Sequence, residues 1–152
     1  ARPGVQGSKG EGLLNGLAWG WPENVSPRPV VDDLDAEVLG RYNSDNAVSA
    51  ARKTVDGFQS FYFADIALMP SVMRKVFEQA GAHIWTSDDS IIQTDGRILE
   101  VHRSAAGPLA IHLPEGVAAK AISAAITKQE GNVVELHLER DQSAWLELTT
   151  AK

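Results

Sequence analysis

The stretch FQSFYFADIALMPSVMRKVFEQAGAHIWT, residues 58–86, carries the strongest fold signal in the chain. It opens with an apolar, aromatic run, Phe58–Met69, which predicts a buried strand leading into a loop. Pro70 follows where a helix can begin, because its missing N–H costs nothing at the first helical position. Residues 82–85 return to a strand-like pattern. Strand, helix and strand in this order predict a βαβ-type unit with the helix packed on a sheet.

Helical periodicity supports this central helix. One stripe of the helix is apolar and consists of Val72, Met73, Val76, Phe77 and Ala80. The opposite face is polar, and its Arg74–Glu78 pair has the i,i+4 spacing that stabilises a helix. Gly81 is placed to end the helix, since glycine adopts the left-handed conformation without steric cost.

Composition limits the domain count and the partner classes. The chain has 152 residues, 43% of them apolar, which suits one ordinary domain or two small ones. Its formal charge of −6 argues against nucleic acid as a partner, because binding to phosphates requires clustered Lys and Arg side chains. No run reaches the roughly 18 apolar residues of a membrane span. The absence of cysteine excludes disulfides and thiolate chemistry, but fits both a cytoplasmic and a secreted protein.

The first 28 residues are rich in glycine and proline, which predicts an arm and not a compact element. Leu13, Leu14, Trp19 and Trp21 make part of this arm too apolar to remain in water. We therefore expect these four residues to form an interface, either with the chain's own sheet or with a partner surface.

The second half of the chain consists of short amphipathic strands separated by polar turns. Asp95-Gly96 lies between two β-prone runs and predicts a hairpin with a type I′ turn, which needs positive φ at both positions. From Leu109 onward apolar and polar residues alternate, with strands expected over 109–113, 122–127, 134–139 and 145–149. Residues 107–152 are therefore expected to form a small antiparallel β domain.

Metal and cofactor chemistry finds little support in the sequence. Asp32, Asp33 and Asp35 lie within four residues, but too few further ligands follow for a calcium loop, so a solvated turn is the better interpretation. The four histidines lack the close spacing of a metal-binding pair. We expect no metal site and no cofactor.

Carbohydrate binding is one functional candidate. Trp85 precedes Asp88 and Asp89, an arrangement that could stack a sugar ring and hydrogen-bond its hydroxyls, but the favoured alternative is that Trp85 packs its strand against a neighbour. Trp145 on the last strand is the other candidate platform. A free-standing hydrolase using Asp88 or Asp89 with His83 is a third possibility. A carboxylate pair for glycoside hydrolysis could also draw on Asp65 or Glu100, provided the two side chains converge across a cleft.

A longer resemblance runs from about Val31 to Pro114. It rests on six blocks in a characteristic order: residues 36–42, 61–64, 68–74, 80–85, 98–102 and 111–114. These blocks resemble the C-terminal end of the family-42 β-galactosidases and their agarase-like relatives. In that family a catalytic (β/α)8 barrel is followed by a glutamine-amidotransferase-like, flavodoxin-like trimerisation domain and then by a small β domain.

The resemblance implies a non-catalytic piece of a longer protein. The family's two catalytic glutamates lie in the barrel, and no residue here matches them; the amidotransferase cysteine has no counterpart either. We thus expect an α/β fold, mainly β with one clear helix, in which residues 29–106 form a partial flavodoxin-like, amidotransferase-like sheet and the antiparallel β domain follows. The implied role is assembly within a glycoside-hydrolase-like protein, with a larger catalytic chain or copies of itself as partner. Any open sheet edge should be covered by such a partner, by more of the parent chain or by the N-terminal arm.

Overall fold

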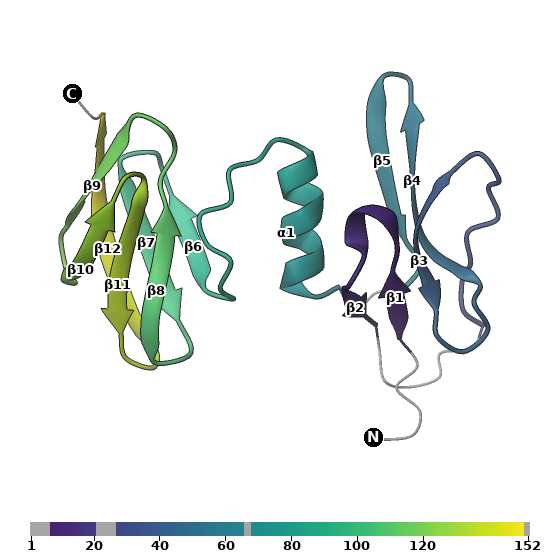
Figure 1. The fold of residues 1–152 in the computed structure, drawn as a ribbon, viewed down its shortest axis with the longest axis horizontal. Helices are drawn as coiled ribbons and strands as arrows, with labels where there is room; N and C mark the ends of the chain where they lie inside the picture. The colour runs from purple at the N-terminus through teal and green to yellow at the C-terminus, as the bar shows by residue number, and fades with distance from the viewer. Residues whose placement is uncertain (1–6, 21–26, 66–67, 151–152) are drawn as a thin grey trace. The chain divides into compact units, whose positions relative to one another are not determined.

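The computed structural model describes residues 7–20, 27–65 and 68–150. The chain divides into two compact units, Ala1–Val76 and Phe77–Lys152, whose elements are labelled in Figure 1. The division falls inside the helix. It differs from the expected boundaries after residues 28 and 106, because the arm belongs to the first sheet and the strands after residue 90 belong to the second unit.

The first unit is an antiparallel sheet of five strands in the order β2-β1-β3-β4-β5. Its elements are β1 (Ser8–Gly10), the 3-10 helix η1 (Gly12–Leu14), β2 (Ala18–Trp19), β3 (Glu37–Tyr42), β4 (Val48–Val55) and β5 (Phe58–Phe63). Residues 29–33 are assigned to no strand, although the Val31 N–H bonds the Val48 carbonyl of β4 at 3.0 Å.

The described part of the arm is built into this sheet. Ser8 pairs with Tyr42, and Gly10 pairs with Gly40, so β1 covers the outer edge of β3. The close fit explains the glycine in β3: a Cβ on Gly40 would lie 2.3 Å from the ring of Trp19. Of the three covers expected for an open sheet edge, the arm is the one that pairs with β3, although the sheet is antiparallel and not parallel.

The core of the first unit lies between the sheet, the arm and the start of the helix. Its buried residues are Leu14, Trp19, Leu39, Ala50 and Val72. The Trp19 ring meets Phe63 edge-on at 5.9 Å. Helix α1 (Pro70–Gln79) begins at the predicted proline and ends before Gly81, whose φ of 80° and N–H bond to the Glu78 carbonyl close the last turn.

The predicted βαβ unit is not formed. The strand pairs described for β5 and its sheet are all antiparallel, and residues 82–86 lie in no strand. These residues instead run beside the end of β8, where the Trp85 carbonyl accepts the His112 N–H at 2.7 Å. The mainly β fold with one clear helix is confirmed, but the first sheet lacks the parallel order of a flavodoxin-like fold.

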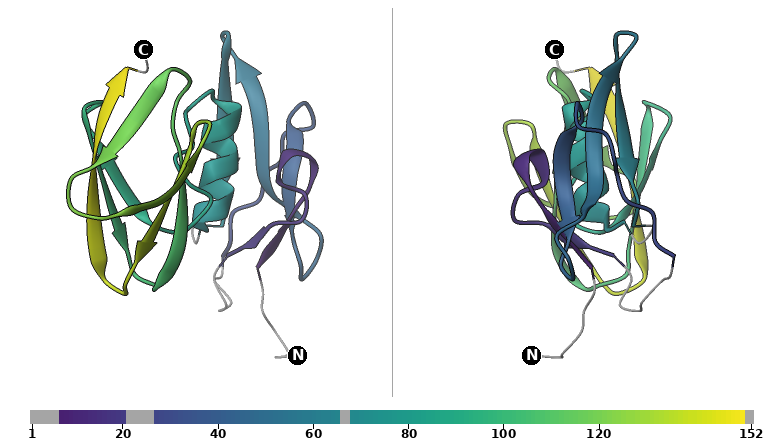
Figure 2. Two further views of the ribbon diagram at one scale, coloured as in Figure 1. Left: turned by 60° about the vertical axis from the view of Figure 1, so that its left-hand side comes forward. Right: turned by 90° about the vertical axis from the view of Figure 1, so that its right-hand side faces the viewer.

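The second unit is a pair of antiparallel sheets, seen from two sides in Figure 2. One sheet has the order β10-β11-β8 and the other β6-β7-β12-β9. The strands are β6 (Ile91–Thr94), β7 (Ile98–Arg103), β8 (Gly107–His112), β9 (Val117–Ala121), β10 (Ile126–Glu130), β11 (Val133–Leu138) and β12 (Gln142–Thr150). The antiparallel module is thus larger than expected, because β6 and β7 join it. The strand expected over 122–127 is replaced by two strands: residues 117–121 pair with β12, and residues 126–130 pair with β11.

The alternation read from the sequence places the core of the second unit. Inward-facing residues of both sheets form one cluster: Leu99, Val101, Leu109, Ile111, Leu113, Val134, Leu136, Leu138, Ala144, Leu146 and Leu148. Their neighbours along each strand face outward, as Trp145 and Glu147 do on β12. A period of two along the strands therefore fixed which side chains are buried.

The two Asp-Gly turns differ from each other. The hairpin at Asp95-Gly96 is confirmed, but of these two residues Gly96, at 86°, is the one with positive φ. The Asp95 carboxylate accepts the N–H groups of Arg97 and Ile98, each at 2.8 Å. Asp56 and Gly57 instead have φ of 49° and 85° and join Val55 directly to Phe58. The turn with positive φ at both positions therefore lies between β4 and β5.

Candidate functional site

Trp85 is a packing residue of the second unit. It is partly buried against the core between the two sheets, and its ring meets His83 edge-on at 4.7 Å. His83 in turn bonds the His112 carbonyl through Nε2 at 2.7 Å, which assigns the proton to that nitrogen. The segment is thereby fixed to β8, and the packing alternative describes Trp85 better than a sugar platform does.

Asp88 anchors the loop that follows. Its carboxylate accepts hydrogen bonds from Arg103 Nη2 at 2.9 Å and from Ser90 Oγ at 2.7 Å. Arg103, whose side chain is 10% exposed, also donates to the carbonyls of Gly107 and Pro108. Asp88 thus orients an almost buried guanidinium that ties this loop to the start of β8. Asp89 beside it is exposed.

The role of Arg103 could not be predicted from the sequence. It occupies an inward-facing position of β7, where alternation alone predicts an apolar residue. A charged side chain is tolerated at this position because backbone carbonyls and a carboxylate accept its hydrogen bonds in the folded chain.

The carboxylates considered for hydrolysis have separate surroundings. Asp65 is buried in the first unit, where Ser8 Oγ lies 3.5 Å from its carboxylate. Glu100 lies on the outer face of β7, directly across from Trp145. His83 uses its Nε2 on a backbone carbonyl, so that nitrogen is not directed at Asp88 or Asp89.

The acidic turn at residues 32–35 is stabilised by hydrogen bonds and an ion pair. Lys53 Nζ lies 2.8 Å from the Asp33 carboxylate, which also accepts the Asp35 N–H at 3.0 Å. The bond to Lys53 is the largest cause that lowers the pKa of Asp33, and the same bond raises the pKa of Lys53. Among the described residues no group of three His, Asp or Glu side chains is arranged to hold a metal ion.

Two of the four predicted interface residues are buried in the core of the first unit. Leu14 is fully buried, and Trp19 is 4% exposed, so neither can meet a separate partner. Leu13 packs partly buried against the same core, and Trp21 lies outside the described residues. The arm therefore docks on its own sheet, which is one of the two surfaces the sequence allowed, and the proposed partner must use other residues.

Apolar surface is left instead on the β4–β5 hairpin. Phe58 is 58% exposed, Tyr62 50% and Val55 40%. Phe61 and Phe63 point to the other face of β5 and pack against the core. The first residue of β3 lies opposite Arg52, so the part of the β4–β5 hairpin after Arg52 extends beyond β3, as Figure 1 shows. The sequence predicted this whole aromatic run as buried; only the polar residues between its aromatics hint at a second, exposed face.

A shallow groove of about 330 Å³ adjoins this exposed face. Its lining combines apolar side chains with one ion pair: Val31, Asp33, Ala36, Ala51, Arg52, Lys53, Val55, Ser60 and Tyr62. Residues 31–36 form one wall, and the β4–β5 hairpin forms the other.

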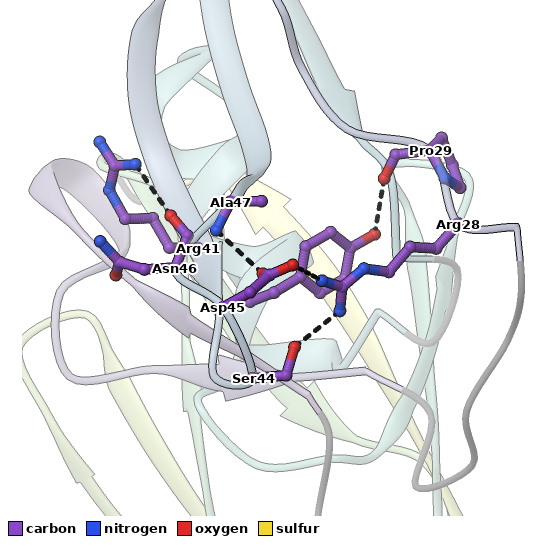
Figure 3. A network of polar contacts seen from close by, with 8 residues as sticks. Arg28, Pro29, Arg41, Ser44, Asp45, Asn46 and Ala47 are labelled. Carbon is purple, nitrogen blue, oxygen red and sulfur yellow. Dashed lines mark hydrogen bonds and ion pairs between the residues drawn. The ribbon is translucent and has the colours of Figure 1, made fainter.

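A polar network fixes the segment that leads into this wall (Figure 3). Arg28 forms an ion pair with Asp45, donates to Ser44 Oγ at 2.8 Å and lies over the Tyr42 ring at 4.1 Å. The Tyr42 hydroxyl donates to the Pro29 carbonyl at 3.0 Å. Burial is the main cause that raises the pKa of Tyr42, which keeps its hydroxyl a donor. The segment at residues 28–29 is therefore held against the β3–β4 turn.

Trp145 is the exposed tryptophan of the second unit. It lies on the outer face of the four-stranded sheet with 47% of its surface exposed, and its backbone N–H bonds Ser123 Oγ at 2.9 Å. Glu100 lies opposite it on β7, and His102 and Ser143 lie one row away, joined at 3.1 Å. Of the two tryptophans considered for sugar binding, this one has an accessible ring.

Comparison of the chain with protein-family models, curated proteins and solved structures finds no match. None of the helices within the described residues has the length and apolar character needed to cross a membrane.

Proposed function

We propose that this chain is a non-catalytic assembly segment of a glycoside-hydrolase-like protein, and that it holds subunits together through β5. The link to glycoside hydrolases rests on the resemblance of residues 31–114 to the C-terminal end of family-42 β-galactosidases. The assembly role is supported by one observation above all, the exposed aromatic residues on the edge strand β5.

An edge strand offers hydrogen bonds as well as apolar surface. Among the strands of the described residues, β5 pairs with β4 alone, so its other edge can offer N–H and C=O groups of the kind that recruit a further strand. The strand FQSFYF carries no charge, so it lacks the lysine or other inward-facing charge that commonly blocks such pairing. Strand addition is therefore the mode of association that β5 favours.

The sequence of β5 is complementary to itself, which favours a second copy of the chain as the partner. If two copies of β5 pair antiparallel about Ser60, Phe58 of each lies opposite Tyr62 of the other. Directly opposed aromatic pairs add about 0.2–1 kcal/mol each to a sheet. The twofold arrangement forms this pair twice and keeps the aromatic faces of both sheets on one side, as an isologous dimer requires.

Sedimentation velocity over a concentration series tests this proposal. We expect the 16.4 kDa chain to form a dimer whose population rises with concentration, and the Phe58→Ser/Tyr62→Ser variant to remain monomeric. Ile122→Ser is the matched control, because Ile122 is 53% exposed but belongs to the second unit. A dimer that persists in the double variant, or a wild-type chain that is monomeric at every concentration, would contradict assembly through two copies of β5.

A cysteine substitution tests the register separately. The chain contains no cysteine, so Ser60→Cys introduces a single thiol at the proposed twofold axis. Opposed residues in a sheet lie close enough for a disulfide, and we expect mild oxidation to give a covalent dimer. Leu34→Cys is the control, since Leu34 is fully exposed but lies outside β5. Equal rates of cross-linking in the two variants would argue against the register centred on Ser60.

A further inference from the structure

The outer face of the four-stranded sheet carries an aromatic ring within a row of polar side chains. Gln93 of β6 pairs with Glu100 of β7, and Glu100 pairs with Trp145 of β12, so the three side chains share one face across adjacent strands. Strands lie about 4.8 Å apart. The polar end groups therefore follow the indole at intervals comparable to the width of a sugar ring.

A second row borders the first. His102 pairs with Ser143, and His102 Nδ1 lies 3.1 Å from Ser143 Oγ. On the other side of Trp145 the chain leaves β9, and Ser123 Oγ accepts the Trp145 backbone N–H. Carboxylate, amide, imidazole and hydroxyl groups thus lie around the ring on the sheet, and the exposed Ile122 also adjoins Trp145, since its N–H bonds the Trp145 carbonyl at 2.9 Å.

The chemistry of this surface fits one class of ligand. A half-exposed indole offers a flat apolar face against which the C–H groups of a pyranose can pack. The surrounding groups include both donors and acceptors, which a sugar's hydroxyls need at the rim of that contact. We propose that this face, centred on Trp145, binds a neutral oligosaccharide.

Charge makes the choice of a neutral ligand specific. Glu100 lies beside Trp145, and Glu147 follows two residues later on the same face, where Lys120 of β9 pairs with it. The whole chain carries a formal charge of −6. Uronate or sulfated sugars would bring further negative charge close to these carboxylates and would be repelled. This surface belongs to the second unit, so the inference does not depend on assembly through β5.

Affinity electrophoresis in gels that contain a neutral polysaccharide tests the proposal. The probes are β-1,4-galactan, xylan and hydroxyethyl cellulose, and polygalacturonate serves as the anionic comparison. We expect at least one neutral polymer to retard the wild-type chain and polygalacturonate to have no effect. Trp145→Ala should weaken binding about tenfold, in line with the loss of an aromatic contact.

Three variants make the result specific to the site. Phe77→Ala removes a similarly exposed aromatic residue, on helix α1 and outside the four-stranded sheet, and should leave retardation unchanged. Trp145→Phe keeps a smaller ring and should retain part of the binding. Trp85→Phe should also bind like wild type. Absence of retardation by all three neutral polymers would overturn the proposal, as would equal retardation of the wild-type chain and Trp145→Ala.

Discussion

The two units of this chain use apolar residues in different ways. In the second unit, leucine, valine and isoleucine alternate along the strands of both sheets and are buried between them, while the outer face of the four-stranded sheet combines polar side chains with the exposed Ile91, Ile98 and Trp145. In the first unit, the described part of the arm and the start of α1 cover one face of the single sheet. The far end of the β4–β5 hairpin keeps Phe58 and Tyr62 exposed.

This difference shows why the two proposed surfaces have different characters. Two facing sheets can bury each other's apolar faces, although Ile91, Ile98, Ile122 and Trp145 of the second unit remain exposed. A single sheet has an uncovered face and two edges, which makes it suited to association. We accordingly place assembly on the first unit and ligand binding on the second.

The largest effect should come from the core of the second unit. Leu146 is fully buried between the two sheets, so Leu146→Ala should lower the free energy of unfolding of that unit by about 2–5 kcal/mol. Thr149→Ala, at an exposed position of the same strand, is the control. Peptide-resolved hydrogen exchange measures the loss of protection. If the strands of the first unit lose protection equally, the two cores are not separate, and the comparison fails.

A smaller effect is expected where the arm meets the sheet. Gly40→Ala would place a methyl group against the Trp19 ring, and such overpacking costs about 1–3 kcal/mol. Urea denaturation measures the cost. A smaller cost in a Trp19→Phe background would show that the two side chains compete for the same space. The same cost in both backgrounds would mean that the arm does not pack on β3 as described.

The smallest effect concerns the β6–β7 turn and its pH dependence. The backbone N–H groups of Ile98 and Arg97 lower the pKa of Asp95 from 3.8, so its ionised form is favoured in the folded chain. This contribution to stability is therefore present above about pH 4 and is lost as the pH falls through the lowered pKa. We expect the wild-type chain to be slightly more stable than Asp95→Asn at pH 6, with the difference vanishing in acid. A stability difference that stays constant down to pH 2 would contradict this role for the carboxylate.

Much of the fold could be predicted because its signals are local. Pro70 and Gly81 marked the helix ends, and alternation from Leu109 onward marked β8, β11 and β12 of the second unit. The predicted βαβ unit failed because strand direction depends on partners: β5 pairs with β4 through a tight turn, and residues 82–86 run beside β8. Apolar content alone does not distinguish a buried parallel strand from an edge strand with one exposed face.

The candidate sites were less predictable for the same reason. Trp85 and Trp145 both lie near acidic residues in the sequence, yet the fold packs one against the core and leaves the other accessible. Leu14 and Trp19 were correctly identified as too apolar for water, but the arm buries them in its own unit.

The sequence by itself determined the helix, the turns and the inward face of the second unit, because capping residues and a period of two act over a few neighbouring residues. Tertiary structure alone decided that the arm completes the first sheet, that Arg103 is held by carbonyls and Asp88, and that Phe58, Tyr62 and Trp145 remain exposed. Each of these features depends on which distant segments come into contact, and a local sequence pattern does not determine the free energy of such contacts.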